Sequence, residues 1–178
     1  MRYHYYVEGN CEKKLIDEFK KQQLPIISGK IDVFNAVQEE FTNTRLRMLP
    51  ENTVVILVFD TDTGIVEILN RNLEILKKHP RVKETWCVMQ VYNLEDEIKR
   101  STDVKEIKDL LGSKSNKEYK HDFIVEKNLY DKLKRHQFDF DRIWVTNPDN
   151  VFGVIKNCGE KIKKRGCILF KISRCINT

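Results

Sequence analysis

Short apolar runs alternate with longer amphipathic stretches from the first residue onward. The apolar runs have the length and the β-branched and aromatic content typical of strands. They predict strands at residues 2–7, 31–34, 54–59, 85–91 and 142–145, with a last one at 167–172. The run at 54–59 is nearly all apolar, which indicates a central strand buried on both faces.

The stretches between these runs carry apolar residues at the spacing of one helix face. The clearest is 65–78, with Ile65, Leu69 and Leu76 in register and Pro80 after its end. Helices are predicted at residues 12–22, 36–48, 65–78, 94–100, 104–111, 124–136 and 151–164. Residues 112–120, rich in Ser, Asn and Lys, are predicted to form a mobile loop near a site.

Strands that alternate with helices favour an α/β fold, here a single Rossmann-like domain. We expect a mostly parallel central sheet with helices on both faces. A chain of 178 residues has room for one domain with a substantial core, and it is short for two. Residues 1–100 are expected to form the core domain, and 101–178 a carboxy-terminal α/β extension packed on the same domain.

Composition narrows the class of protein. Hydrophobic residues make up 40% and charged residues 33%, which indicates a globular chain rather than a disordered one. The net charge of +5 is compatible with a nucleic-acid partner, although lysine clusters also solvate helix faces. The five cysteines form no C-x-x-C pair and no apolar run reaches membrane-spanning length, so we expect reduced thiols, a cytoplasmic location and no membrane partner.

Acidic residues follow three of the predicted strands. Glu8 follows the first strand, Asp60 and Asp62 the third, and Glu95 and Glu97 the fourth. The carboxyl ends of parallel strands meet at one edge of a sheet, where ligands bind, so these side chains are expected to converge. Carboxylate oxygens in such a cluster suit Mg²⁺ or Mn²⁺.

The segment V-E-G-N-C-E at residues 7–12, followed by a β-α unit and V-F-D-T-D at 58–62, resembles the Toprim domain of topoisomerases, primases and related nucleases. The spacing E-G-x-x-E, with N-L-E-D-E at 93–97, is most similar to the OLD and RloB-like small Toprim nucleases. The resemblance covers roughly residues 1–100. It would make this part the Toprim-like core.

The resemblance implies roles for individual residues. Glu8 would bind metal or act as general acid/base, Asp60 and Asp62 would be D-x-D metal ligands, and Glu12 would be an additional ligand. Weaker candidates are Glu95 and Glu97, whose position in the first turn of a helix also explains them, and Lys120, which would stabilise charge on a phosphoryl group.

The leading hypothesis is a nuclease of DNA or RNA that hydrolyses phosphodiesters with a divalent metal. By analogy with the OLD and RloB-like proteins, it would act in phage defence or mobile-element biology. A homodimer or a partner protein of a defence system is left open as well.

Two other hypotheses fit the same residues. In a haloacid-dehalogenase-type phosphatase, Asp60 would be the nucleophile and form an aspartyl-phosphate. In a non-catalytic Toprim-like protein, the scaffold would bind a partner or sense a phage component.

Overall fold

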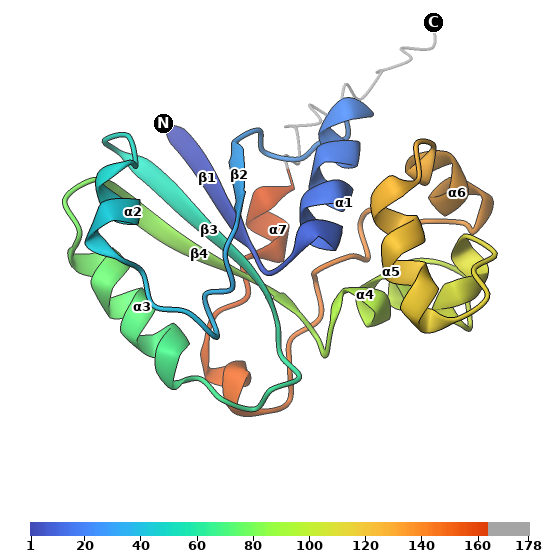
Figure 1. Cartoon of the computed structure of the whole chain (residues 1–178). Coiled ribbons are helices and arrows are strands. Elements are labelled where there is room, and N and C mark those ends of the chain that lie inside the picture. Colours follow the sequence, from blue (N-terminus) through green and yellow to red (C-terminus); the bar gives the residue numbers. More distant parts are fainter. Residues whose placement is uncertain (164–178) are drawn as a thin grey trace, which may run out of the picture.

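A computed structural model describes residues 1–163. Its centre is a four-stranded sheet in the order β2-β1-β3-β4, in which every neighbouring pair is parallel (Figure 1). The strands are β1 (Arg2–Val7), β2 (Lys30–Val33), β3 (Thr53–Asp60) and β4 (Val82–Gln90). Every β3 residue except the last is buried, as its apolar sequence predicts.

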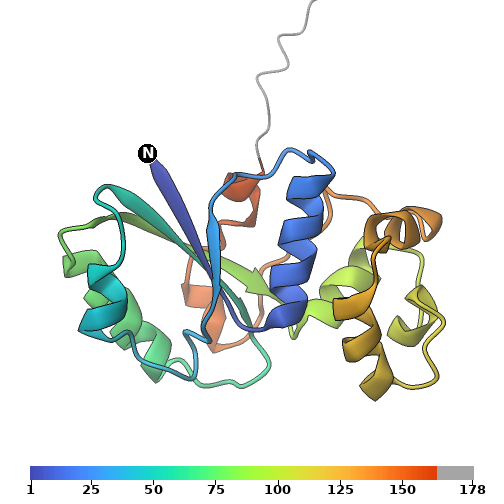
Figure 2. The ribbon, with the colours of Figure 1, turned by 45° about the horizontal axis from the view of Figure 1, so that its top comes forward.

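Helices cover both faces of the sheet, which confirms the predicted α/β class (Figures 1 and 2). Helix α1 (Asn10–Lys21) lies on one face, and α2 (Asn43–Arg47) with α3 (Glu67–Lys78) on the other. Side chains of a strand alternate between faces, so Tyr5 belongs to the core under α1 and Tyr6 to the core under α3.

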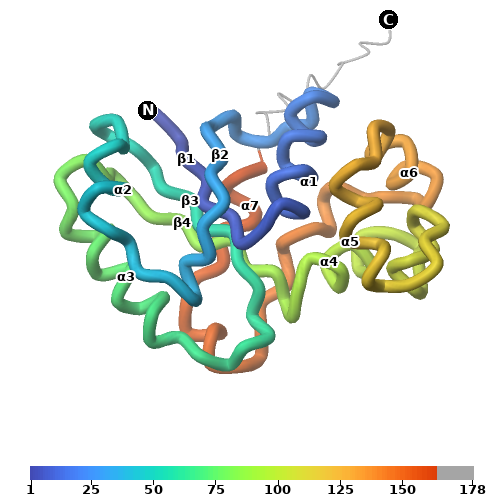
Figure 3. The backbone as a smooth tube through the Cα atoms, in the orientation of Figure 1, coloured from blue at the N-terminus to red at the C-terminus, as the bar shows by residue number. Residues whose placement is uncertain are grey.

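After β4 the chain forms a group of helices beside α1 and then returns to the sheet (Figure 3). These elements are α4 (Leu94–Ser101), the 3₁₀ turn η1 (Ile107–Leu110), α5 (Asn116–Val125), α6 (Leu129–Arg135), the 3₁₀ turn η2 (Val151–Val154) and α7 (Gly159–Ile162). Phe123, Leu133 and Trp144 share one apolar core with Phe19 of α1. The helical group therefore packs directly on the sheet domain.

Several predicted elements are wrong. Residues 142–144 form a turn rather than a strand, Val145 lies outside any strand, and Trp144 has a positive φ of 61°, outside the β region. The predicted helix at 36–48 shrinks to Asn43–Arg47. The buried Asn72 side chain of α3 donates to the carbonyls of Ala36 and Glu39 and so holds that segment in turns.

The later helices also differ from their prediction. The helix expected at 124–136 is split between α5 and α6, because Glu126 has an extended backbone with ψ of 122°. In place of the single helix predicted at 151–164, the described part of this segment holds η2 and α7. Between them lies Asn157, whose side-chain amide donates to the carbonyls of Trp144 and Thr146. The helix predicted at 104–111 is only η1, and the strand predicted at 167–172 lies outside the described residues.

The predicted loop at 112–120 is wrong in its second half. Helix α5 begins at Asn116, and the Ser115 hydroxyl accepts the backbone N–H of Glu118 as its cap. Lys120 therefore lies on a helix. Among residues 1–163, no helix has the length and apolar composition to cross a membrane.

Candidate active site

Glu8 and Asp60, 52 residues apart in the sequence, meet at the carboxyl edge of the sheet. Strands β1 and β3 are neighbours in register, with Val7 opposite Val58. The next residue, Glu8, donates its backbone N–H to the Val58 carbonyl at 3.2 Å, and its carboxylate accepts the Asp60 N–H at 3.0 Å. The backbone pairing of the two strands thus fixes the first pair of predicted site residues.

Glu12 joins this pair from the first turn of α1. Its side chain is 6% exposed. A Cβ atom at Gly9 would stand 3.1 Å from Glu12 Oε2, so a side chain there would crowd the carboxylate. Burial, together with the nearby Glu8 and Glu95, raises the pKa of Glu12 to about 7.

Asp60 is the centre of the cluster. Burial raises its pKa to about 9, and the carboxylates of Glu8, Glu12, Asp62 and Glu95 act in the same direction. Its Oδ1 atom is buried and has no hydrogen-bond partner among the described residues. A buried carboxylate oxygen that faces other acids is costly unless a cation or a proton compensates it.

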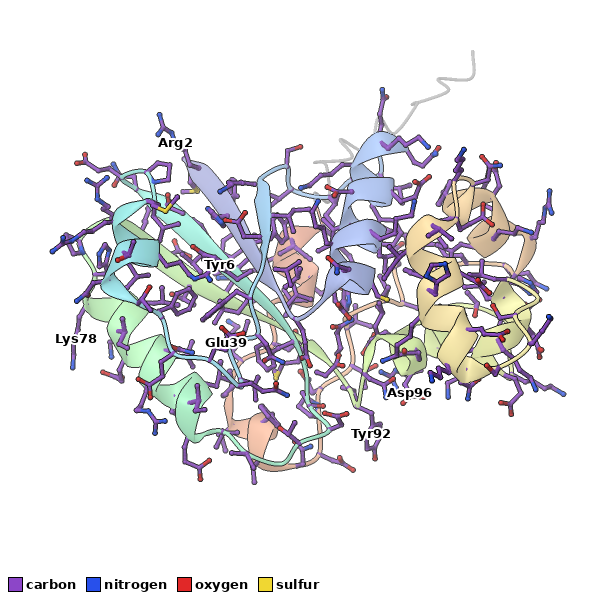
Figure 4. All side chains as sticks on the ribbon, viewed as in Figure 1. Arg2, Tyr6, Glu39, Lys78, Tyr92 and Asp96 are labelled. Carbon is purple, nitrogen blue, oxygen red and sulfur yellow. The ribbon has the colours of Figure 1, made fainter. Side chains whose placement is uncertain are left out.

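A cavity of about 350 Å³ opens beside Asp60, between the end of β3 and the helices α4 and α5. It is lined by Asp60, Asp62, Asn93, Glu95, Asp96, Lys99, Ile107, Asn116 and Lys120. In Figure 4, Tyr92 and Asp96 mark this end of the sheet, and Arg2 marks the opposite end. The predicted residues Asp60, Asp62, Glu95 and Lys120 are therefore brought to one place.

Two lysines lie beside the acids that line this cavity: Lys120 of α5 pairs with an acid of α4, and Lys99 pairs with an acid of its own helix. Lys120 Nζ lies 3.2 Å from Glu95, whose carboxylate raises the pKa of the lysine, and Lys99 Nζ lies 2.5 Å from Asp96. Both amines are partly exposed. They are the groups of this site that are suited to contact a phosphate.

The structure does not bring Glu97, predicted as a metal ligand, to the cavity. Its side chain is completely buried and points into the protein. It accepts the N–H groups of Val91 at 2.9 Å and Trp144 at 2.8 Å and pairs with Arg100 at 2.6 Å. Glu97 instead connects α4, the residue that follows β4 and the turn that contains Trp144.

Sequence reasoning missed several polar residues around the acids. Asn93, Lys99 and Asn116 line the cavity. Gln90 lies opposite Asp60 in the sheet and is fully buried, and neither atom of its amide group has a partner among residues 1–163. Gln90 could have been recognised from the sequence as a candidate site residue, because it is a polar residue at the end of the apolar run 85–91. No sequence pattern marks Lys99 or Asn116 as site residues.

The donor set fits a hard divalent cation, because carboxylate oxygens predominate and one of them is buried without a partner. Glu8, Glu12, Asp60 and Asp62 are the residues that would hold it. Within residues 1–163, however, no three His, Cys, Asp or Glu side chains are already grouped as metal ligands.

Comparison of the chain with family models, curated proteins and solved structures finds no match. The features of the chain that bear on its function are therefore the geometry of the acidic cavity and the short motifs that build it.

Proposed function

We propose that the chain is a nuclease that hydrolyses phosphodiester bonds in DNA or RNA with a bound Mg²⁺ or Mn²⁺. The observation that carries this proposal is the convergence of acids from β1, α1, β3 and α4 around the buried Asp60 carboxylate. Such a cluster is unfavourable by itself and becomes favourable with a cation. The resemblance of residues 7–12 and 58–62 to Toprim motifs supports the same assignment.

Each group has a distinct role in this proposal. Glu8, Asp60 and Asp62, with Glu12 for a second ion, are the metal ligands. A bound divalent cation supplies Lewis-acid polarisation of the phosphate and a more acidic water. Lys99 and Lys120 contact phosphate oxygens, for which they exchange their present partners Asp96 and Glu95.

A nucleic-acid substrate agrees with the charge of the whole chain. The chain has a net charge of +5 although the site itself is acidic, so lysine and arginine side chains are in excess over the rest of the molecule. Such basic side chains can contact a phosphate backbone. By analogy with the OLD and RloB-like proteins, we propose a role in phage defence.

Cleavage of labelled DNA and RNA in Mg²⁺, Mn²⁺ and EDTA tests the proposal. We expect cleavage with metal, none with EDTA, and a loss of more than about a hundredfold in Asp60→Asn, which keeps the shape of the side chain and removes its charge. Glu74→Gln, an exposed acid on α3, is the matched control and should cleave like the parent. Equal activity of the parent and Asp60→Asn rejects the mechanism.

The same assay separates the other hypotheses. Hydrolysis of a small aryl phosphate without cleavage of oligonucleotides would favour the phosphatase with Asp60 as nucleophile. Inactivity on both substrates, with no shift of thermal unfolding in Mg²⁺, would favour a binding protein.

A further inference from the structure

A second cavity lies over the β1–β2 half of the sheet, beside α2. It has a volume of about 290 Å³. Its lining residues are His4, Tyr6, Lys30, Asp32, Thr42, Thr44, Arg45 and Met48, none of which lines the acidic cavity. Figure 4 labels one of its lining residues, Tyr6, whose side chain belongs to the core on the α2 and α3 face of the sheet, away from the labelled Tyr92 and Asp96. The two cavities are thus separate.

Arg45 gives this second cavity its character. Its guanidinium carbon lies 4.4 Å from the centre of the Phe34 ring and 5.8 Å from that of Tyr6. No carboxylate of the described residues lies within ion-pair distance of it. A guanidinium that is stacked on aromatic rings is held in place while its N–H groups remain available to a ligand. This arrangement allows arginine to bind a phosphate with two parallel hydrogen bonds, in bidentate geometry.

The one acid of this cavity is already paired. Asp32 lies 2.8 Å from His4 Nε2 and 2.9 Å from Lys30 Nζ. Lys30 and Arg45 therefore leave the cavity with an excess of positive charge over Asp32. The Thr42 hydroxyl accepts the Arg45 backbone N–H, so its own proton is free to donate.

We propose that this cavity binds the phosphate group of a small phosphomonoester, with Arg45 as the principal ligand and Lys30 and Thr42 beside it. Its volume is just below the usual range for ligand pockets, about 300–1,000 Å³, and suits a phosphate with a small organic group rather than a large cofactor. The exposed Met48 side chain supplies an apolar wall for that organic group.

Binding is measured by NMR titration or calorimetry in EDTA, so that no metal bridges a phosphate to the acidic site. The probes are inorganic phosphate, adenosine monophosphate and adenosine. We expect saturable binding of adenosine monophosphate and none of adenosine. Inorganic phosphate that binds as tightly as the monophosphate assigns the site to free phosphate, and weaker binding assigns it to the ester.

Two substitutions with opposite expected effects on binding affinity make the test specific. Arg45→Met should weaken binding by about tenfold or more, whereas Asp32→Asn should strengthen it, because it removes a repelling charge and releases Lys30. Arg47→Met, an exposed arginine of α2 outside the cavity, is the matched control and should bind like the parent.

The proposal is overturned if adenosine monophosphate and phosphate both fail to bind, or if Asp32→Asn binds them no more tightly than the parent. The second criterion holds even if Arg45→Met does not fold. Asp60→Asn should bind the probes normally. Loss of binding in that variant would place the phosphate at the acidic cavity and also overturn the assignment.

Discussion

Glu97 and Asp60 are both acids near the carboxyl edge of the sheet, yet their surroundings differ completely. The oxygens of Glu97 accept two backbone N–H groups and face Arg100. One oxygen of Asp60 has no partner in the described part of the chain, and its neighbours are acids. A residue of the first kind stabilises the fold, whereas one of the second kind is typical of a functional site.

Glu97→Ala should lower the free energy of unfolding by about 3 kcal/mol or more. The substitution leaves the Val91 and Trp144 N–H groups buried without acceptors and the Arg100 charge without its partner. Urea denaturation measures the change. Glu74→Ala, which removes an exposed pair with Lys78, should change it by less than about 1 kcal/mol, and equal effects of the two substitutions would contradict this prediction.

Asp60→Asn should increase stability in the absence of divalent metal. With its pKa raised to about 9 by burial and by the neighbouring acids, Asp60 is protonated in the folded protein at neutral pH and ionised in the unfolded chain. Folding therefore has to take up a proton, and asparagine, which is neutral in both states, avoids this cost. We expect the free energy of unfolding at neutral pH to rise by more than about 1 kcal/mol in EDTA. A variant that is both less stable and inactive would instead mean that Asp60 is a structural residue.

At the scale of elements, close contacts between backbone segments hold α7 and the residue before it against the sheet domain. Cys158 donates its N–H to the Cys87 carbonyl of β4 at 2.7 Å. The next residue, Gly159, begins α7, and a Cβ atom there would lie 1.8 Å from the Trp144 carbonyl oxygen. Only glycine fits at this contact.

Gly159→Ala should therefore destabilise the protein by at least about 2 kcal/mol, because the clash is with backbone and no rotamer change relieves it. Gly112→Ala is the control. It has open space around the Cβ position but a positive φ of 72°, so it should cost only about 1 kcal/mol. Thermal or urea unfolding compares the two, and a Gly159→Ala protein as stable as the Gly112→Ala protein would refute the contact.

At the scale of the whole molecule, acid should weaken the fold through His4. Burial lowers the pKa of His4 below its usual 6.5, and it outweighs the opposite effect of Asp32. The unfolded chain therefore takes up the proton first as the pH falls, so the contribution of His4 to stability is present above about pH 6.5 and is lost below it.

The free energy of unfolding of the parent and of His4→Gln, measured at pH 7.5 and 5.5, isolates this contribution. The advantage of the parent over the variant should be smaller at pH 5.5, because only the parent loses stability through this group. The acids around Asp60 titrate equally in both proteins, so their contribution cancels when the free energy of unfolding of the variant is subtracted from that of the parent at each pH. An advantage that grows on acidification would show that His4 is more easily protonated in the folded protein.

Local sequence was sufficient for the sheet because each strand is a short run whose apolar content reflects burial on one or both faces. Strand β1 lies where it was predicted, and β3 extends one residue further at each end. The helix at 36–48 was predicted wrongly, because contacts with a distant residue, Asn72, override local periodicity. The helix at 124–136 is interrupted at Glu126, where the backbone is extended.

The sequence by itself determined the parallel sheet and the placement of Glu8 and Asp60 at its edge, because strand patterns and strand ends are local properties. Only the tertiary structure decided that Glu97 turns inward, that Lys120 pairs with Glu95, and that Arg45 stacks over Phe34 beside a second cavity. Those relations join segments far apart in the chain, and no spacing of residues encodes them.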